Sequence, residues 1–261
     1  MRSTRVGLIA VGMAAALASV APARAEDGSI QERVQAQLHK AGVDKNGDVA
    51  VAVDGKQVTL SGFVTTLATE NDALKAAHKV SKDVVDALRV VPEQERPDAD
   101  VAKDVQKAIL RYPKYTIFDS VSIGVDQGTL RLEGSVLQPY RKDDIENLVA
   151  KIPGIRKIDD QIWVQRVSGF DADLRRQLSR AIYRNNLFDR YAFQANPPIH
   201  IVVDGGRVTL TGVVGSPVEQ AALGHIARQS MAFSVDNKVE VEGPTKDHKP
   251  DPKDTVDTVN N

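Results

Sequence analysis

The chain contains no cysteine among its 261 residues. This absence excludes disulfide bonds, catalysis by a thiol, metal sites built from cysteine and a lipid-modified cysteine at a cleavage site. The protein therefore has to fold on packed cores alone, which is feasible for domains of ordinary size.

Long apolar runs are missing except at the N-terminus. Arg2 and Arg5 form a short basic start, residues 6–20 are a small-residue apolar run, and Ala23-Arg24-Ala25 fits the A-x-A cleavage pattern. These are the three parts of a secretory signal peptide. The run of about 15 residues is shorter than the roughly 20 that span a bilayer, although retention as a membrane anchor is the alternative. We predict a cleaved signal peptide at residues 1–25.

An excess of positive charge is also missing. The chain has 34 Lys and Arg residues against 35 Asp and Glu residues. Loss of Arg2, Arg5 and Arg24 with the signal peptide lowers the first number to 31, which gives a net charge of about −4. Because nucleic-acid binding depends on surplus Lys and Arg, we expect no nucleic-acid partner.

Sequence signals for catalysis are absent as well. There is no G-x-S-x-G nucleophile turn and no glycine-rich phosphate loop. The five histidines show no helical metal-pair spacing: His39, His78, His200, His225 and His248. Three aspartates recur along the chain, but they fall in predicted hairpin turns that explain them: Asp54, Asp126 and Asp204. We expect no enzymatic activity, no cofactor and no metal site.

The chain does contain one segment repeated three times. Residues 49–64, 121–136 and 199–214 align, and the glycines near their ends lie 72 and 78 residues apart: Gly62, Gly134 and Gly212. A period of this size is a domain length, longer than a solenoid unit of about 20–50 residues. The sequence therefore predicts three tandem copies of one small module.

The third copy shows the pattern of the module most clearly. Apolar residues recur every four positions, as on one side of an amphipathic helix: Leu174, Leu178 and Ile182. Residues 199–203 and 207–211 then predict two strands joined by an Asp-Gly-Gly turn. Within this hairpin His200 faces away from the apolar positions, so we expect it to be solvated or hydrogen-bonded. Pro217 opens a second helix, and a last strand follows.

The other copies follow the same order, with last strands at residues 84–90 and 158–164. Two helices on one face of a three-stranded sheet bury one layer between them. We therefore predict an α+β protein of three tandem αββαβ modules, each with two helices packed on a three-stranded mixed sheet. The predicted divisions are a signal peptide at 1–25, modules at 27–91, 98–167 and 171–243, and a disordered tail at 244–261.

Two local details follow from the repeat. Short polar residues are placed to cap the first helix of each module: Ser29, Asp100 and Asp173. A glycine inside a strand weakens it unless the backbone bulges or another element packs closely. We interpret Gly62, Gly134 and Gly212 as structural and expect a helix to cross at each of them.

The segment [VI]-x-V-D-G-x-x-V-T-L-x-G-x-V, between a helix and a second helix, resembles the BON domain. The likeness is best at residues 201–214 and 51–64, whereas the middle copy has Gln127-Gly128-Thr129 in place of the usual turn. The resemblance implies an αββαβ fold, a periplasmic location and a role in envelope maintenance or the osmotic-stress response. It also implies contact with phospholipid or envelope proteins, and it supplies no shared catalytic residues.

Two features distinguish the second and third copies from the first. One is a basic row on the opening helix, spaced i, i+4, i+8: Lys103, Lys107 and Arg111 in the second copy, and Arg176, Arg180 and Arg184 in the third. Such a row lies on one helical side, away from the apolar stripe. It is either a docking surface for anionic headgroups or a solvated surface with intrahelical ion pairs.

The other feature is an aromatic segment after the opening helix. Its members include Tyr115 and Phe118 in the second copy, and Phe188 and Tyr191 in the third. These side chains either bind partner proteins, as in a chaperone-like module, or pack the modules. The first copy lacks both features and is interpreted as a divergent spacer; no feature indicates an oligomeric state.

Overall fold

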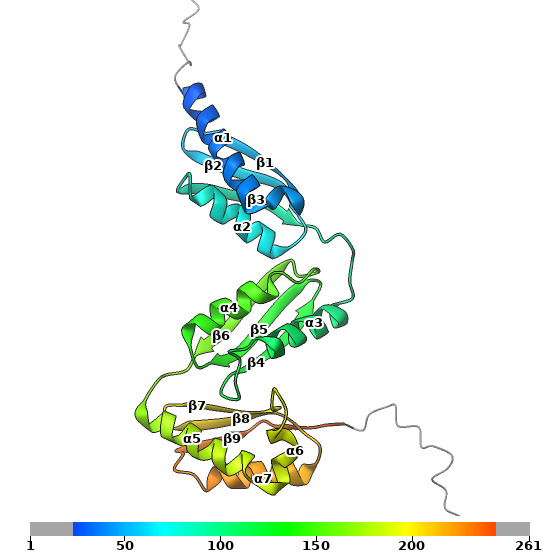
Figure 1. Cartoon of the computed structure of the whole chain (residues 1–261), viewed down its shortest axis with the longest axis vertical. Helices are drawn as coiled ribbons and strands as arrows, with labels where there is room; N and C mark the ends of the chain where they lie inside the picture. The colour runs from blue at the N-terminus through cyan, green and yellow to red at the C-terminus, as the bar shows by residue number, and fades with distance from the viewer. Residues whose placement is uncertain (1–22, 244–261) are drawn as a thin grey trace, which may run out of the picture. The chain divides into compact units, whose positions relative to one another are not determined.

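The computed structural model describes residues 23–243, which form three modules in tandem (Figure 1). The expected signal peptide lies outside these residues except for Ala23-Arg24-Ala25, and the expected tail lies outside them entirely. Within residues 23–243, no helix has both the length and the apolar character needed to cross a membrane. The chain divides into two compact units. Most of the first module makes up one, and the second and third modules together with residues 65–69 belong to the other.

The first module places two helices against one three-stranded sheet of order β1-β2-β3. Its strands β1 and β2 are antiparallel, with Val53 opposite Val58 at the hairpin. Val34 and Leu60 are fully buried between the layers. The elements are α1 (Ala23–Ala41), the 3-10 helix η1 (Val43–Lys45), β1 (Gly47–Asp54), β2 (Gln57–Val64), α2 (Leu67–His78) and β3 (Asp83–Val90).

The second module repeats this arrangement, with α3 and α4 on one face of a sheet of order β4-β5-β6 (Figure 1). β4 is antiparallel to β5, and β6 is parallel to β5, so the sheet is mixed. Val105, Leu132 and Ile145 fill the single buried layer. The elements are α3 (Asp98–Arg111), β4 (Ser120–Asp126), β5 (Thr129–Val136), α4 (Pro139–Val149) and β6 (Lys157–Val164).

The third module has the same core with additions. Its last strand is broken into two short pieces that both run parallel to β8, and a one-turn helix follows the first helix. Pro217 begins α7 as predicted. The elements are α5 (Gly169–Tyr183), η2 (Asn186–Phe188), α6 (Asp189–Ala192), β7 (Ile199–Asp204), β8 (Arg207–Val214), α7 (Pro217–Arg228), β9 (Ser234–Asn237) and β10 (Glu240–Val241). The predicted α+β class and the αββαβ order are confirmed.

The predicted helix caps were wrong. α1 begins before Ser29, and α3 and α5 begin before Asp100 and Asp173. α5 is capped by Ser168, whose hydroxyl accepts a hydrogen bond from the Asp171 amide at 3.0 Å. The first-turn aspartates instead accept amides of the neighbouring hairpin turn. Asp98 accepts from Gln127 and Gly128, and Asp171 accepts from Gly205 and Gly206. In both modules an aspartate thus ties the helix to the hairpin.

The repeated glycines have left-handed φ angles of +114° at Gly62, +122° at Gly134 and +111° at Gly212. A Cβ atom added to any of them would overlap a backbone carbonyl oxygen of the neighbouring chain segment, that of Asp48, Ser120 or Pro198 respectively. The expected helix crossing was therefore wrong. The close neighbour is the partner strand or the residue before it, so a residue without a side chain is needed where the two antiparallel segments approach.

Candidate functional site

The two basic rows lie on the exposed sides of α3 and α5. The apolar stripes of the same helices are at most 3% exposed, from Val101 to Ile109 and from Leu174 to Ile182, whereas all six basic residues are exposed. Lys103 pairs with Asp100 at 3.1 Å and Arg176 pairs with Asp173, one turn earlier in each helix. The other four form no ion pair with any described residue: Lys107, Arg111, Arg180 and Arg184.

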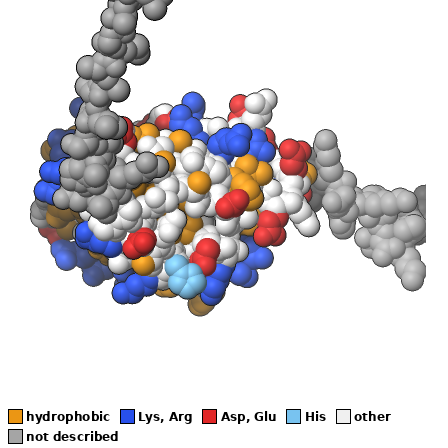
Figure 2. Space-filling model, turned by 90° about the horizontal axis from the view of Figure 1, so that it is seen from above, with side chains coloured by type: hydrophobic (Ala, Val, Ile, Leu, Met, Phe, Trp, Pro, Cys, Tyr) orange, Lys and Arg blue, Asp and Glu red, His pale blue; other side chains and the backbone are white. Residues whose placement is uncertain are grey.

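Charge is mixed on one face of the described chain. Figure 2 shows Lys and Arg side chains interspersed with Asp and Glu side chains on the face that it presents. The basic rows are thus local features of two helices and do not belong to a generally basic protein.

The aromatic segments pack inside the second compact unit. Phe188 and Tyr191 are 0% and 6% exposed and belong to the core of the third module. Phe118 of the second module is partly buried against that same core. The Tyr115 hydroxyl accepts a hydrogen bond from the Val121 amide at 3.0 Å. The partner-binding interpretation was therefore wrong for Phe188 and Tyr191, because buried side chains cannot meet a partner of the folded module.

The second and third modules are joined by polar contacts between β4, β7 and the segments around them. The Ile201 amide donates to the Ile117 carbonyl at 2.7 Å, and the hydroxyls of Ser120 and Thr211 lie 2.8 Å apart. The buried Arg175, 4% exposed, donates to Gln165 at 3.0 Å and to the Val203 carbonyl. Burial lowers the pKa of Arg175, while the nearby Asp171, Asp204 and Asp119 act in the opposite direction.

An ion pair adds to this junction at the end of the short linker. Arg166 donates to Asp204 at 2.8 and 3.2 Å. The hydrogen bonds from Arg166 lower the pKa of Asp204 against the opposing effect of burial. Asp54, Asp126 and Asp204 each end the first strand of a hairpin. Asp204 in addition binds Arg166 of the linker.

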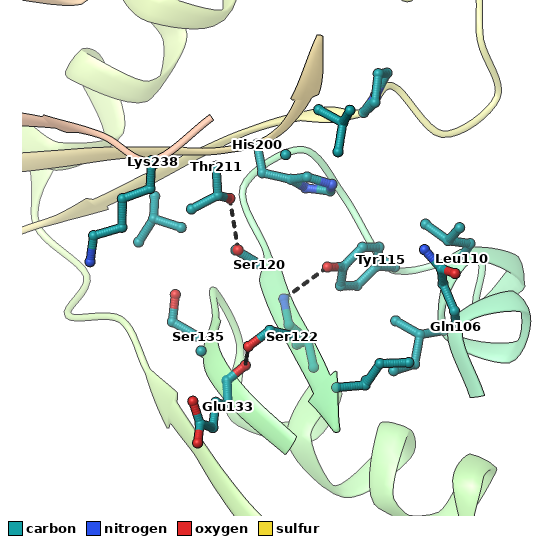
Figure 3. A pocket seen from close by; sticks show the side chains of 18 of the residues that line it. Gln106, Leu110, Tyr115, Ser120, Ser122, Glu133, Ser135, His200, Thr211 and Lys238 are labelled. Atoms are coloured by element: carbon teal, nitrogen blue, oxygen red, sulfur yellow. Dashed lines mark hydrogen bonds between the residues drawn. The ribbon is translucent and has the colours of Figure 1, made fainter. Parts of the chain in front are cut away.

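Beside these contacts a groove of about 820 Å³ opens between the two sheets (Figure 3). One wall carries outward-facing residues of β4, β5 and β6, and the other carries outward-facing residues of β7, β8 and β10. Tyr115 and His200 lie at one end of it, with ring centroids 5.5 Å apart. Gln106, Ile109 and Leu110 of α3 also line the groove.

His200 lines this groove, is partly buried and is hydrogen-bonded to the backbone, as one of the two expected alternatives had it. Burial lowers its pKa below the usual value of 6.5, and this effect outweighs hydrogen bonding to the backbone of Thr116 and Asp119 and the Asp119 charge. Nδ1 of His200 is buried and has no hydrogen-bond partner. His200 is therefore neutral in the folded protein near pH 7.

One carboxyl group of the first module also has a perturbed pKa. Burial and the neighbouring Asp86 raise the pKa of Glu70 to about 7. Two carboxylates alone do not make a metal site, and residues 23–243 contain no group of three His, Cys, Asp or Glu side chains suited to a metal ion. Among the histidines, His248 lies outside the described residues.

Sequence reasoning missed the groove. The alternation of polar and apolar residues in β4, β5 and β8 marks Ser122, Glu133 and Thr209 as outward-facing, which was a usable signal. What no local pattern shows is that two such faces meet. That arrangement depends on contacts between residues about 90 positions apart, such as Ser120 with Thr211.

Comparison with known proteins agrees with the modular fold. A family model described as BON domain matches residues 26–92, 97–166 and 170–243. The chain is 28% identical over 144 residues to osmotically-inducible protein Y of Escherichia coli strain K12, a match that covers 52% of this chain and 72% of that protein.

Solved structures with a detectable likeness are more distant. A structural protein of the type III secretion system of Chlamydia trachomatis, CdsD, aligns over 80% of this chain and 92% of its own, at 12% identity and a TM-score of 0.25. The periplasmic domain of PrgH from S. typhimurium aligns over 80% of this chain and 100% of its own, at 11% identity and a TM-score of 0.22. Scores of this size carry no argument about function.

Proposed function

Because the chain belongs to the BON domain family and carries three tandem copies of the domain, we propose that it is a non-enzymatic binding protein of the bacterial periplasm. Its proposed task is to contact anionic phospholipid surfaces in envelope maintenance or the osmotic-stress response. The similarity to an osmotically-inducible protein supports the stress role. The N-terminal export signal predicted from the sequence supports the location.

The observation that carries the phospholipid part is the pair of basic rows. Both rows face away from the cores, and four of their six cations have no acidic partner among the described residues. Each basic side chain near an anionic bilayer surface contributes about 1 kcal/mol. This attraction decays over a Debye length of about 10 Å at 0.1 M salt, so binding of this kind is salt-sensitive.

The test is co-sedimentation of the mature chain with vesicles of phosphatidylglycerol and phosphatidylcholine at low and high salt. We expect the protein to pellet with anionic vesicles at low salt and to be released as the salt is raised. Reversal of the four unpaired cations should abolish pelleting: Lys107→Glu, Arg111→Glu, Arg180→Glu and Arg184→Glu.

A matched control reverses four exposed cations of the first module, Lys75, Lys79, Lys82 and Arg89. Both variants have the same net charge, so a difference between them assigns binding to the rows. Equal loss in both would show only non-specific attraction. Retention of the wild-type protein in the supernatant at low salt would end the proposal.

Protein binding is a second candidate, favoured by exposed apolar side chains at one end of the third module. Val167, Phe170, Met231 and Phe233 are 74%, 39%, 73% and 77% exposed. The rings of Phe170 and Phe233 stack at 5.4 Å over Gly206. Clusters of this kind on soluble surfaces mark interaction sites.

This candidate is tested by suppression of the aggregation of reduced, unfolded lysozyme. Phe233→Ser should weaken suppression, whereas Phe193→Ser, at a side chain that is 89% exposed, should not. If both variants protect the client as well as the wild type does, the apolar cluster has no chaperone-like role.

A further inference from the structure

The groove between the second and third modules has the layout of a ligand site. Its volume of about 820 Å³ falls within the range of about 300–1,000 Å³ that is usual for such sites. A hydrogen bond between Ser120 and Thr211 crosses it at 2.8 Å and fixes the separation of its two walls (Figure 3). The cavity is therefore a feature of the joined modules and of neither module alone.

The lining is rich in hydroxyl groups. On the second module, strand pairing places Ser120 beside Ser135 and Ser122 beside Glu133. On the third, it places His200 beside Thr211 and Val202 beside Thr209. Each Ser or Thr hydroxyl both donates and accepts. Ser120 and Thr211 bond each other and Ser135 is only 2% exposed. Ser122 and Thr209 therefore remain for a ligand that also carries hydroxyls around its edge.

The charged groups of the groove do not suit an anion. Lys238 pairs with Asp236 at 3.3 Å, and Glu133 lies 3.7 Å from Arg131. Glu240 forms no ion pair with the part of the chain that the structure describes. Since no uncommitted cation lines the cavity and one uncommitted carboxylate does, a phosphate headgroup is disfavoured there.

One large aromatic surface faces the groove. Trp163 of β6 lies beside Ser135, lines the cavity and remains 46% exposed, which is unusual for a side chain of this size. The face of an indole ring is electron-rich and attracts the weakly positive hydrogens of C–H bonds. A pyranose ring presents C–H bonds on one face and hydroxyls around its rim.

We propose that this groove binds a neutral oligosaccharide. One sugar ring stacks its C–H face on Trp163, while its hydroxyls bond to Ser122 on one wall, to Thr209 on the other and to Glu240. This site is separate from the basic rows, so its existence does not depend on phospholipid binding.

Trp163 is the only tryptophan of the chain, so its fluorescence reports occupancy of the groove directly. We expect a saturable change in emission when the intact mature protein is titrated with chitotetraose or maltotetraose. Calorimetry should give the same dissociation constant. Retention on chitin beads would assign a polymeric glycan as the source, and binding of soluble tetramers alone would assign short free sugars.

Variants separate the groove from other surfaces. By calorimetry, Trp163→Ala should weaken binding at least about tenfold, because stacking is lost, and Trp163→Phe should keep part of it. Thr209→Val should weaken binding severalfold, and Phe193→Ala should leave it unchanged. Circular dichroism checks that each variant is folded.

Three results would overturn the proposal. One is the absence of any saturable signal with either sugar at millimolar concentration. Another is unchanged affinity in folded Trp163→Ala and Trp163→Phe. The third is that dihexanoyl-phosphatidylglycerol, and neither sugar, changes the emission of Trp163, which would make the groove a lipid site.

Discussion

Replacement of Gly134 by alanine tests how the repeated glycines support the fold. At φ +122° an alanine is strained by about 1–3 kcal/mol. Its Cβ would also lie closer than 3.0 Å to the Ser120 carbonyl oxygen, so β4 and β5 would have to separate and weaken a ladder hydrogen bond, at about 1 kcal/mol. The reduced freedom of the unfolded chain offsets about 0.4–1 kcal/mol. We expect a net loss of about 1–3.6 kcal/mol.

The measurement is urea unfolding followed by the emission of Trp163, which lies in the same sheet as Gly134. The midpoint should fall without a change in slope. Gly124→Ala is the matched control in this sheet, because Gly124 has no left-handed φ and no atom within 4 Å of the added Cβ. Its effect should stay within about 0.5 kcal/mol. Equal destabilisation by the two substitutions would refute the argument from left-handed geometry and carbonyl overlap.

Three further predictions concern titratable groups. Burial lowers the pKa of His200 in the folded protein. Its contribution to stability is therefore full above pH 6.5 and is lost as the pH falls toward the folded-state pKa. In His200→Gln, the midpoint of urea unfolding should depend less on pH between 7.5 and 5.5. The pKa of Glu70 is raised to about 7 in the folded protein. The contribution of Glu70 to stability is therefore full below pH 4.5 and is lost as the pH rises through 7. Glu70→Gln should therefore stabilise the first module at pH 8, by less than about 1 kcal/mol at this partly exposed site, and a destabilised variant would contradict this sign. Glu219 is 5% exposed and accepts hydrogen bonds from Arg190, Tyr191 and Gly215. Glu219→Gln should lower the free energy of unfolding, measured by heat or urea, by about 1–3 kcal/mol. The control Glu240→Gln should lower it by less than about 0.5 kcal/mol.

The repeated hairpins could be predicted because their signals are local. A β-branched strand, an Asp-Gly turn and a returning strand specify each other within about 16 residues, and β1 with β2 and β7 with β8 form as expected. The caps could not be predicted in the same way. Asp98 and Asp171 accept amides of turns about 30 residues away, and the residues near each helix start do not reveal these contacts. Only α5 has a local cap, Ser168, three residues before Asp171.

Among the candidate surfaces, too, only those with a local signal could be predicted from the sequence. The spacing of Lys107 and Arg111 places them opposite the apolar stripe of α3, and helical periodicity alone predicts this. The aromatic segment was ambiguous, because a Phe or Tyr in a loop has the same local pattern whether it packs or protrudes. The structure distinguishes Phe188, at 0% exposure, from Phe193, at 89%. For Phe118, burial depends on how the second module packs on the third. The groove depends on the same packing.

The two proposed sites of the second module use different residues, and this makes a last prediction. The groove is lined by residues of the sheets and by Gln106, Ile109 and Leu110 of α3, but by none of the six basic residues of the rows. A ligand in one site therefore need not displace a ligand from the other.

Protein pelleted on phosphatidylglycerol vesicles should still take up chitotetraose, with an affinity within about twofold of that in solution. The Lys107→Glu, Arg111→Glu, Arg180→Glu and Arg184→Glu variant should lose the vesicles and keep the sugar, whereas Trp163→Ala should lose the sugar and keep the vesicles. Competition between vesicles and sugar for the same protein would contradict this separation, because it would require one surface to serve both ligands.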